Sequence, residues 1–189
     1  MWHRERIKMN FDIAEMRKFA GLTDKEAALL TDMKPMLEKH KDGIVKNFYE
    51  NLDQHDHLKN LLDAKPGRRE ILGTHLGAWI ISLASGQYGE EYQSHRYRIG
   101  ERHVEVGLDP RWVIGAMSFC RGEASGMVDA EYGDAADKMD RMMALDKVMD
   151  LDQNIMLQSY DDKRMDMFLE TTGFSKTLFE SMISSAGAD

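Results

Sequence analysis

The chain has 189 residues, of which 42% are hydrophobic, and a formal net charge of −8 at pH 7. This length suits one domain with a full core and a connecting segment. The acidic balance and the scattered lysines and arginines argue against nucleic-acid binding, because phosphate groups are bound by a basic face. The single cysteine, Cys120, excludes a disulfide framework within the chain and indicates a reducing compartment, so we expect a cytoplasmic protein.

Neither a membrane span nor a signal peptide is predicted. No apolar run approaches the roughly 20 residues that cross a bilayer, so we expect no membrane partner. The start, "MWHRERIKMN", is charged and has no apolar segment of the kind that directs secretion.

Helical periodicity runs through the chain, and strand signals are nearly absent. Residues 1–21 are predicted to form an amphipathic lead segment. Thr23 then begins a helix, with Glu26 placed to complete a capping box. Pro35 begins or kinks the next helix. The stretch "DQHDHLKNLLDAKPG" is predicted to form a short helix or an irregular corner.

Two following helices each present one histidine from an apolar face. In residues 68–85, the neighbours of His75 on adjacent turns are Ile71, Leu72 and Trp79. In residues 90–106, the corresponding neighbours of His103 are Ile99, Gly100, Val106 and Gly107. We therefore expect both imidazoles to face an apolar core.

The last part of the chain is predicted to hold two long helices. Gly107 ends the helix of His103, and Asp109 with Pro110 begins the next helix, which runs to about Ala130. A final helix spans about 135–169, with Leu145, Val148, Leu151 and Ile155 on one stripe. The fold class is therefore all-α.

Two interpretations of these histidines remain open from the residues alone. Both could be core histidines whose imidazoles bond backbone carbonyls, or one could bind a metal. A zinc site needs three or four close nitrogen or sulfur ligands, and none accompany these residues. An apolar pocket with one axial imidazole suits haem instead, and the glycines beside His103 would let a flat macrocycle lie close. No CxxCH motif is present, so such a haem would be held without thioether links.

The string "HRYRIGERHVEVGLDPRWVIGA" strongly resembles the F-helix to G-helix signature of the globin-coupled sensors, and "FYENL" at 48–52 resembles their B-helix motif. The resemblance covers residues 22–165. It implies a globin fold of the sensor-globin type, without a separate D helix and with an extended C-terminal helix. It also implies a haem b cofactor, with His103 as the proximal iron ligand. Tyr49 would be the distal tyrosine whose hydroxyl bonds O2.

The distal side is less sharply defined by the resemblance. Counting along the chain places either Thr74 or His75 at the family's inward position, and the apolar stripe favours His75. His75 could be a sixth iron ligand, polarise a bound gas, or simply pack. The residues expected to line the cofactor are Phe48, Tyr49, Leu72, His75, Leu76, Trp79, Ile99, His103, Val106, Leu108, Trp112 and Met117. Val113 stands where the family often has a second aromatic after the tryptophan.

The resemblance implies a haem-based sensor of a diatomic gas, most of all O2 and also CO and NO, and not an enzyme. Such a domain forms a homodimer through its G and H helices. Residues 166–189 would be a helical linker to a C-terminal output domain of kinase, cyclase or chemotaxis type. Two alternatives are a stand-alone haem globin that binds O2 or turns over NO or peroxide, and a haem-free helical interaction module.

Overall fold

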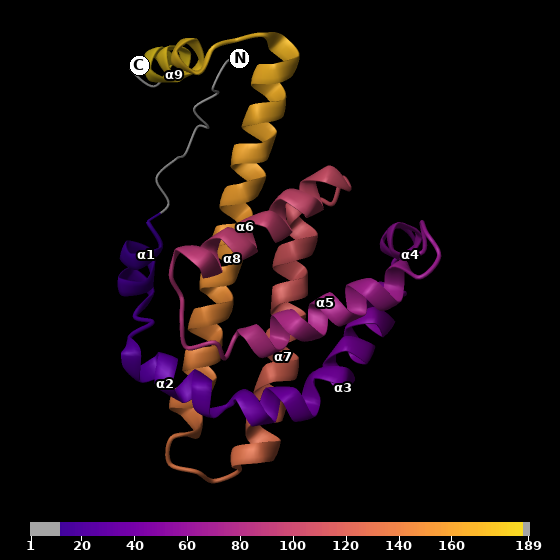
Figure 1. The fold of residues 1–189 in the computed structure, drawn as a ribbon, viewed down its shortest axis with the longest axis vertical. Helices are drawn as coiled ribbons and strands as arrows, with labels where there is room; N and C mark the ends of the chain where they lie inside the picture. The colour runs from indigo at the N-terminus through magenta and orange to yellow at the C-terminus, as the bar shows by residue number, and fades with distance from the viewer. Residues whose placement is uncertain (1–11, 187–189) are drawn as a thin grey trace.

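The computed structural model describes residues 12–186, and every regular element there is an α-helix (Figure 1). The first eleven residues of the expected lead segment and the last three of the expected linker lie outside the described residues. In chain order the helices are α1 (Ile13–Ala20), α2 (Asp24–Asp32), α3 (Lys34–Leu52), α4 (Asp56–Leu62), α5 (Arg68–Ser82), α6 (Glu90–Glu105), α7 (Pro110–Tyr132), α8 (Lys138–Thr172) and α9 (Lys176–Ala186). Within this range no helix is both long and apolar enough to cross a bilayer.

Local sequence signals set several of these boundaries. The capping box predicted at the start of α2 is confirmed, since Glu26 accepts a 2.9 Å hydrogen bond from the backbone N–H of Thr23. The side chain of Asp109 caps α7, and Pro110 follows it as predicted. Gly107 lies just after α6 with a φ of 72°, a left-handed conformation that favours glycine. The corner before α5 contains the short helix α4.

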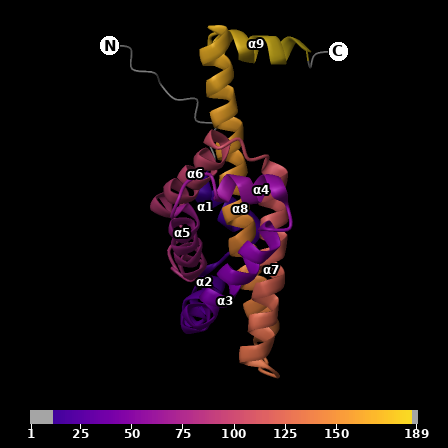
Figure 2. The same cartoon turned by 90° about the vertical axis from the view of Figure 1, so that its right-hand side faces the viewer.

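α8 is the central element of the fold, and α1, α2, α6 and α7 all pack against it. α7 and α8 run side by side along the long axis of the molecule (Figure 2). The stripe predicted on the last helix is confirmed as core, because Leu145, Val148, Leu151 and Ile155 are all buried. The C-terminal part of α8 continues past the other helices to Thr172, and α9 turns away from it (Figure 1).

A buried polar network joins α5, α6 and α8. Its centre is the carboxylate of Asp152 on α8, which is fully buried. This carboxylate accepts hydrogen bonds from Trp79 Nε1 at 2.7 Å, from Arg96 Nε at 3.0 Å and from the hydroxyl of Tyr92. Burial raises the pKa of Asp152, and the Arg96 guanidinium opposes that rise. One carboxylate thus ties together the two histidine-bearing helices and the long helix.

Candidate functional site

His103 lies on the last turn of α6 with its imidazole half-buried. Its Nδ1 atom is buried and has no hydrogen-bond partner. Nδ1 of His103 therefore does not bond a backbone carbonyl, as it would in the alternative of a core histidine. Burial lowers the pKa of His103, so the imidazole is neutral at pH 7. A neutral and incompletely bonded imidazole is the form that binds a metal.

The position of His103 follows from a close approach of α6 to α8. A Cβ atom placed on Gly100 would lie 1.8 Å from Ser159 Oγ and 2.7 Å from the backbone oxygen of Met156. Gly100 is therefore required by contact with α8, and Gly107 by the left-handed turn that ends α6. The expectation that these glycines make room for a flat macrocycle is wrong for Gly100, because protein fills that space.

We expect Gly100→Ala to lower the free energy of unfolding by about 1–3 kcal/mol, the usual cost of inserting a methyl group into a packed interior. Ser159 can rotate away from the new methyl group, but the backbone oxygen of Met156 cannot. Urea denaturation of the haem-free protein measures the effect. The matched control is Gly43→Ala on α3, where nothing lies within 4 Å of the added Cβ. That substitution should be neutral or stabilising by up to about 1 kcal/mol, and an equal loss in both variants would contradict the assignment.

Tyr49 lies near the C-terminal end of α3 with its side chain half-buried. The guanidinium of Arg69 lies 5.6 Å from its ring centroid. Arg69 is itself held by ion pairs to Asp53 at 2.7 Å and Asp63 at 3.1 Å. Burial raises the pKa of Tyr49, although Arg69 opposes this, so the hydroxyl stays protonated at neutral pH. It is thus able to donate a hydrogen bond.

His75 lies beside the buried stripe of α5 and not within it. The buried side chains of this helix are Trp79 and Ile80, whereas those of His75 and Thr74 are exposed. Burial is the main reason why the pKa of His95 on α6 is lowered. The positive charges of Arg96 and Arg98 lower it further, and His75 does so to a smaller extent. His75 therefore lies at the surface of α5, outside the packed face that carries Trp79 and Ile80.

The apolar residues expected to line the cofactor differ in how deeply their side chains are buried. Trp79 and Met117 are buried. The half-buried members of the set are Phe48, Leu72, Leu76, Ile99, Val106, Leu108 and Trp112. Partly exposed apolar side chains on α3, α5 and α6 leave apolar surface that a flat, apolar cofactor could cover.

Two histidines of the α4 corner have a role that the sequence did not indicate. Their polar neighbours predict a solvated corner, yet the rings of His55 and His57 pack against Trp112, with centroids 5.0 and 4.7 Å from the indole. The two rings thus cover part of Trp112 at the start of α7, while the side chain of His57 remains exposed to solvent. The sequence alone does not indicate that these histidines and Trp112 are neighbours, because the contact depends on the three-dimensional fold.

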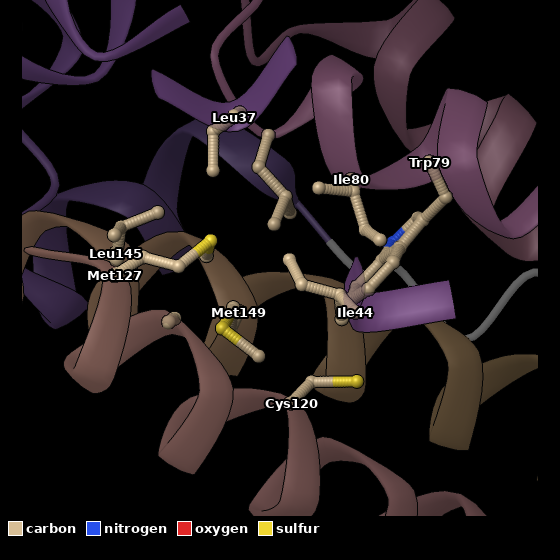
Figure 3. A pocket seen from close by; sticks show the side chains of 10 residues that line it. Leu37, Ile44, Trp79, Ile80, Cys120, Met127, Leu145 and Met149 are labelled. Carbon is tan, nitrogen blue, oxygen red and sulfur yellow. The ribbon is translucent and has the colours of Figure 1, made fainter. Parts of the chain in front are cut away.

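A small apolar cavity of about 10 Å³ lies elsewhere in the core (Figure 3). The side chains around it come from α3, α5, α7 and α8, and those labelled in the close-up include Leu37, Trp79, Cys120 and Met149. Such a volume holds roughly one water molecule, so it cannot hold a macrocycle. Of the residues predicted to line the cofactor, only Trp79 borders it.

Metal binding by a cluster of protein ligands is not supported in the part of the chain that the structure describes. No group of three or more histidine, cysteine, aspartate or glutamate side chains there could hold a metal ion. Among the described residues, His103 has a buried imidazole nitrogen without a partner, and His75 remains the candidate for a sixth ligand. One axial imidazole in apolar surroundings fits haem, with the macrocycle supplying the other ligands.

The helical arrangement and the single candidate imidazole define a globin-type, haem-binding domain. The chain belongs to the Protoglobin family, which it matches over residues 9–166. The globin domain of the Geobacter sulfurreducens globin-coupled sensor is similar, with a TM-score of 0.74 and 27% identity over 78% of this chain and 97% of that domain. These findings confirm the predicted globin fold and the resemblance to globin-coupled sensors.

Two further relatives are similar over most of this chain. The "heme-based aerotactic transducer HemAT" of Halobacterium salinarum is 29% identical over 160 residues, which are 80% of this chain. The present chain spans 33% of the length of that transducer. The ferric globin domain of E. coli DosC shares the fold, with a TM-score of 0.67 and 16% identity over 76% of this chain and 98% of that domain.

Proposed function

We propose that the chain is a haem b sensor domain for a diatomic gas, with O2 as the foremost ligand and CO and NO as others. The observation that carries the proposal is the neutral imidazole of His103, whose buried Nδ1 lacks a partner. His103 would hold the iron through Nε2. When bound, haem supplies an iron coordination position that is open to a small gas molecule.

The chain's own residues would select the gas. The protonated hydroxyl of Tyr49 donates a hydrogen bond toward the ligand and favours polar O2 over the less polar CO. The half-buried apolar side chains of Leu72, Leu76 and Ile99 exclude water from the cofactor. His75, exposed on α5, is the candidate for a sixth ligand or a second polar contact.

The path from His103 toward an output module would run through α8. α6 packs along α8, and α8 continues beyond the other helices to Thr172. A change in the position of His103 is therefore passed to the helix that leaves the domain, and a ligand acts through its differential affinity for two arrangements. Because the transducer relative is aerotactic, a chemotaxis-type output is favoured over a kinase or cyclase, in a cytoplasmic and non-enzymatic sensor.

A homodimer would form through α7 and α8, the helices that correspond to G and H. Gly115, Gly122 and Gly126 on α7 have open space beside them, which permits close approach of another helix. Exposed apolar side chains on the same pair of helices include Ile114, Met139 and Met143. Analytical ultracentrifugation of the wild type and of Gly122→Glu would test this interface, and dimers of equal stability in both would contradict it.

The decisive test is an absorption spectrum of the purified protein after haem reconstitution, recorded ferric and then reduced with dithionite. A Soret band is expected, and its absence would overturn the sensor proposal and favour the haem-free module. Sharp six-coordinate bands in the reduced protein that broaden in His75→Ala would assign His75 as the sixth ligand. A five-coordinate reduced spectrum in both proteins would exclude that role.

Tyr49→Phe is expected to increase the O2 dissociation rate about fivefold, because one hydrogen bond contributes on the order of 1 kcal/mol. The CO dissociation rate should change much less, since CO is a weak acceptor. Flash photolysis and stopped-flow measurements give both rates. Tyr132→Phe, at the far end of α7, is the matched control and should leave both rates unchanged. An equal change for O2 and CO in Tyr49→Phe would show that the hydroxyl does not discriminate between gases.

A further inference from the structure

We propose that the hydroxyl of Tyr160 on α8 positions His103 by accepting a hydrogen bond from Nδ1–H, thereby linking the iron ligand directly to the long helix. This inference rests on the proposed haem binding by His103. It concerns a residue that no sequence motif marks, on a helix other than the one that carries the ligand.

Two neighbouring rings in this part of the core each carry one unpartnered polar atom. Nδ1 of His103 and the hydroxyl oxygen of Tyr160 are both buried, and neither has a hydrogen-bond partner. The two rings are stacked, with centroids 6.5 Å apart and an interplanar angle of 28°. Tyr160 is only 1% exposed, so water does not readily replace the missing partner. Buried polar groups almost always have a partner in native proteins, and here each atom supplies what the other lacks.

The packing of α6 on α8 brings these two residues together. Gly100 lets the helices approach at Met156 and Ser159. His103 lies about one turn further along α6, and Tyr160 about one turn beyond Met156 on α8. The guanidinium of Arg164 lies 5.5 Å from the Tyr160 ring centroid. The contact between α6 and α8 thus places the rings of His103 and Tyr160 next to each other.

The position of the hydrogen on the imidazole determines which atom donates in this bond. A neutral histidine that coordinates iron through Nε2 carries its hydrogen on Nδ1, which must then donate. A hydroxyl that accepts this hydrogen orients the ring and makes the coordinating nitrogen more basic. Tyr160 thus acts through His103 as a positioning residue, and it reports the state of the ligand to α8.

Tyr160→Phe tests the inference, because it removes the hydroxyl and keeps the ring. In the reduced, haem-loaded variant we expect the iron–histidine stretching band in resonance Raman spectra to move to lower frequency. We also expect a more positive midpoint potential and about tenfold faster haem loss, as for other partners of metal ligands. Incorporation of 3,5-difluorotyrosine at position 160 keeps the fold, weakens the acceptor, and should produce a smaller shift in the same direction.

The matched control is Tyr97→Phe, which removes a different hydrogen bond between α6 and α8, the 2.8 Å bond from Tyr97 to Asp162. That variant should retain the wild-type stretching frequency. An unchanged frequency and potential in Tyr160→Phe, or the same shift in Tyr97→Phe, would overturn the role of Tyr160 alone. A wild-type protein without a Soret band would instead overturn the proposed function, and this inference with it.

Discussion

His103→Ala is expected to lower haem affinity by more than about 100-fold, because residues that merely support a metal ligand already contribute about 10- to 100-fold. The substitution removes the described imidazole that combines burial with an unpartnered ring nitrogen. The apolar side chains around it would still contact the macrocycle, so weak binding can persist without a defined iron ligand. The rate of haem transfer to an acceptor apoprotein and the intensity of the Soret band measure the loss.

Two sets of variants separate ligation from packing. His103→Gly should regain a histidine-like spectrum when imidazole is added, because the free imidazole can occupy the space that the side chain leaves. His40→Ala, at a histidine that contacts Glu131, and His95→Ala remove histidines outside the predicted ligand positions and should leave haem affinity within about twofold. A full Soret band of wild-type shape in His103→Ala would refute the assignment. The double variant with His75→Ala would then show whether the distal histidine holds the iron.

Much of the helical framework could be predicted because its signals are local. The side-chain cap at Thr23 and the left-handed glycine at 107 depend on a few adjacent residues, and both are as predicted. The stripe from Leu145 to Ile155 depends only on the helical period, and it is buried throughout. The family signature around His103 added a prediction for the site, because it assigned one candidate iron ligand to one helix.

The polar residues of α8 could not be predicted in this way. Asp152 and Tyr160 lie in the strongly polar stretch "MDLDQNIMLQSYDDKR", where an exposed face is the usual expectation for such residues. Their burial depends on α6, whose Gly100 permits an approach that no periodicity indicates. The same limit applies to His75, whose apolar neighbours in sequence predict a core position, whereas its side chain is exposed.

Asp152→Asn is expected to lower the free energy of unfolding by about 3–5 kcal/mol, the usual cost of removing one partner from a buried ion pair. Arg96 is 2% exposed, and it would keep hydrogen bonds to the hydroxyl of Ser82 at 2.6 Å and the ring nitrogen of His95 at 3.1 Å, and its contact with the Tyr92 ring 3.9 Å away. Neither replaces the lost negative charge. Urea denaturation of the haem-free protein, with the slope compared between variants, measures the loss apart from any effect of the cofactor.

Asp150→Asn is the matched control, since it removes an aspartate from the same helix that pairs with Arg121 at the surface. Exposed pairs contribute about 0–1 kcal/mol, so this variant should remain close to the wild type. Asp152→Leu should cost more than Asp152→Asn, because the asparagine oxygen can still accept from Trp79 or Tyr92 and leucine can accept from neither. Equal stability of the Asp150 and Asp152 variants, or a smaller loss with leucine, would mean that apolar packing and not the carboxylate joins α5 and α6 to α8.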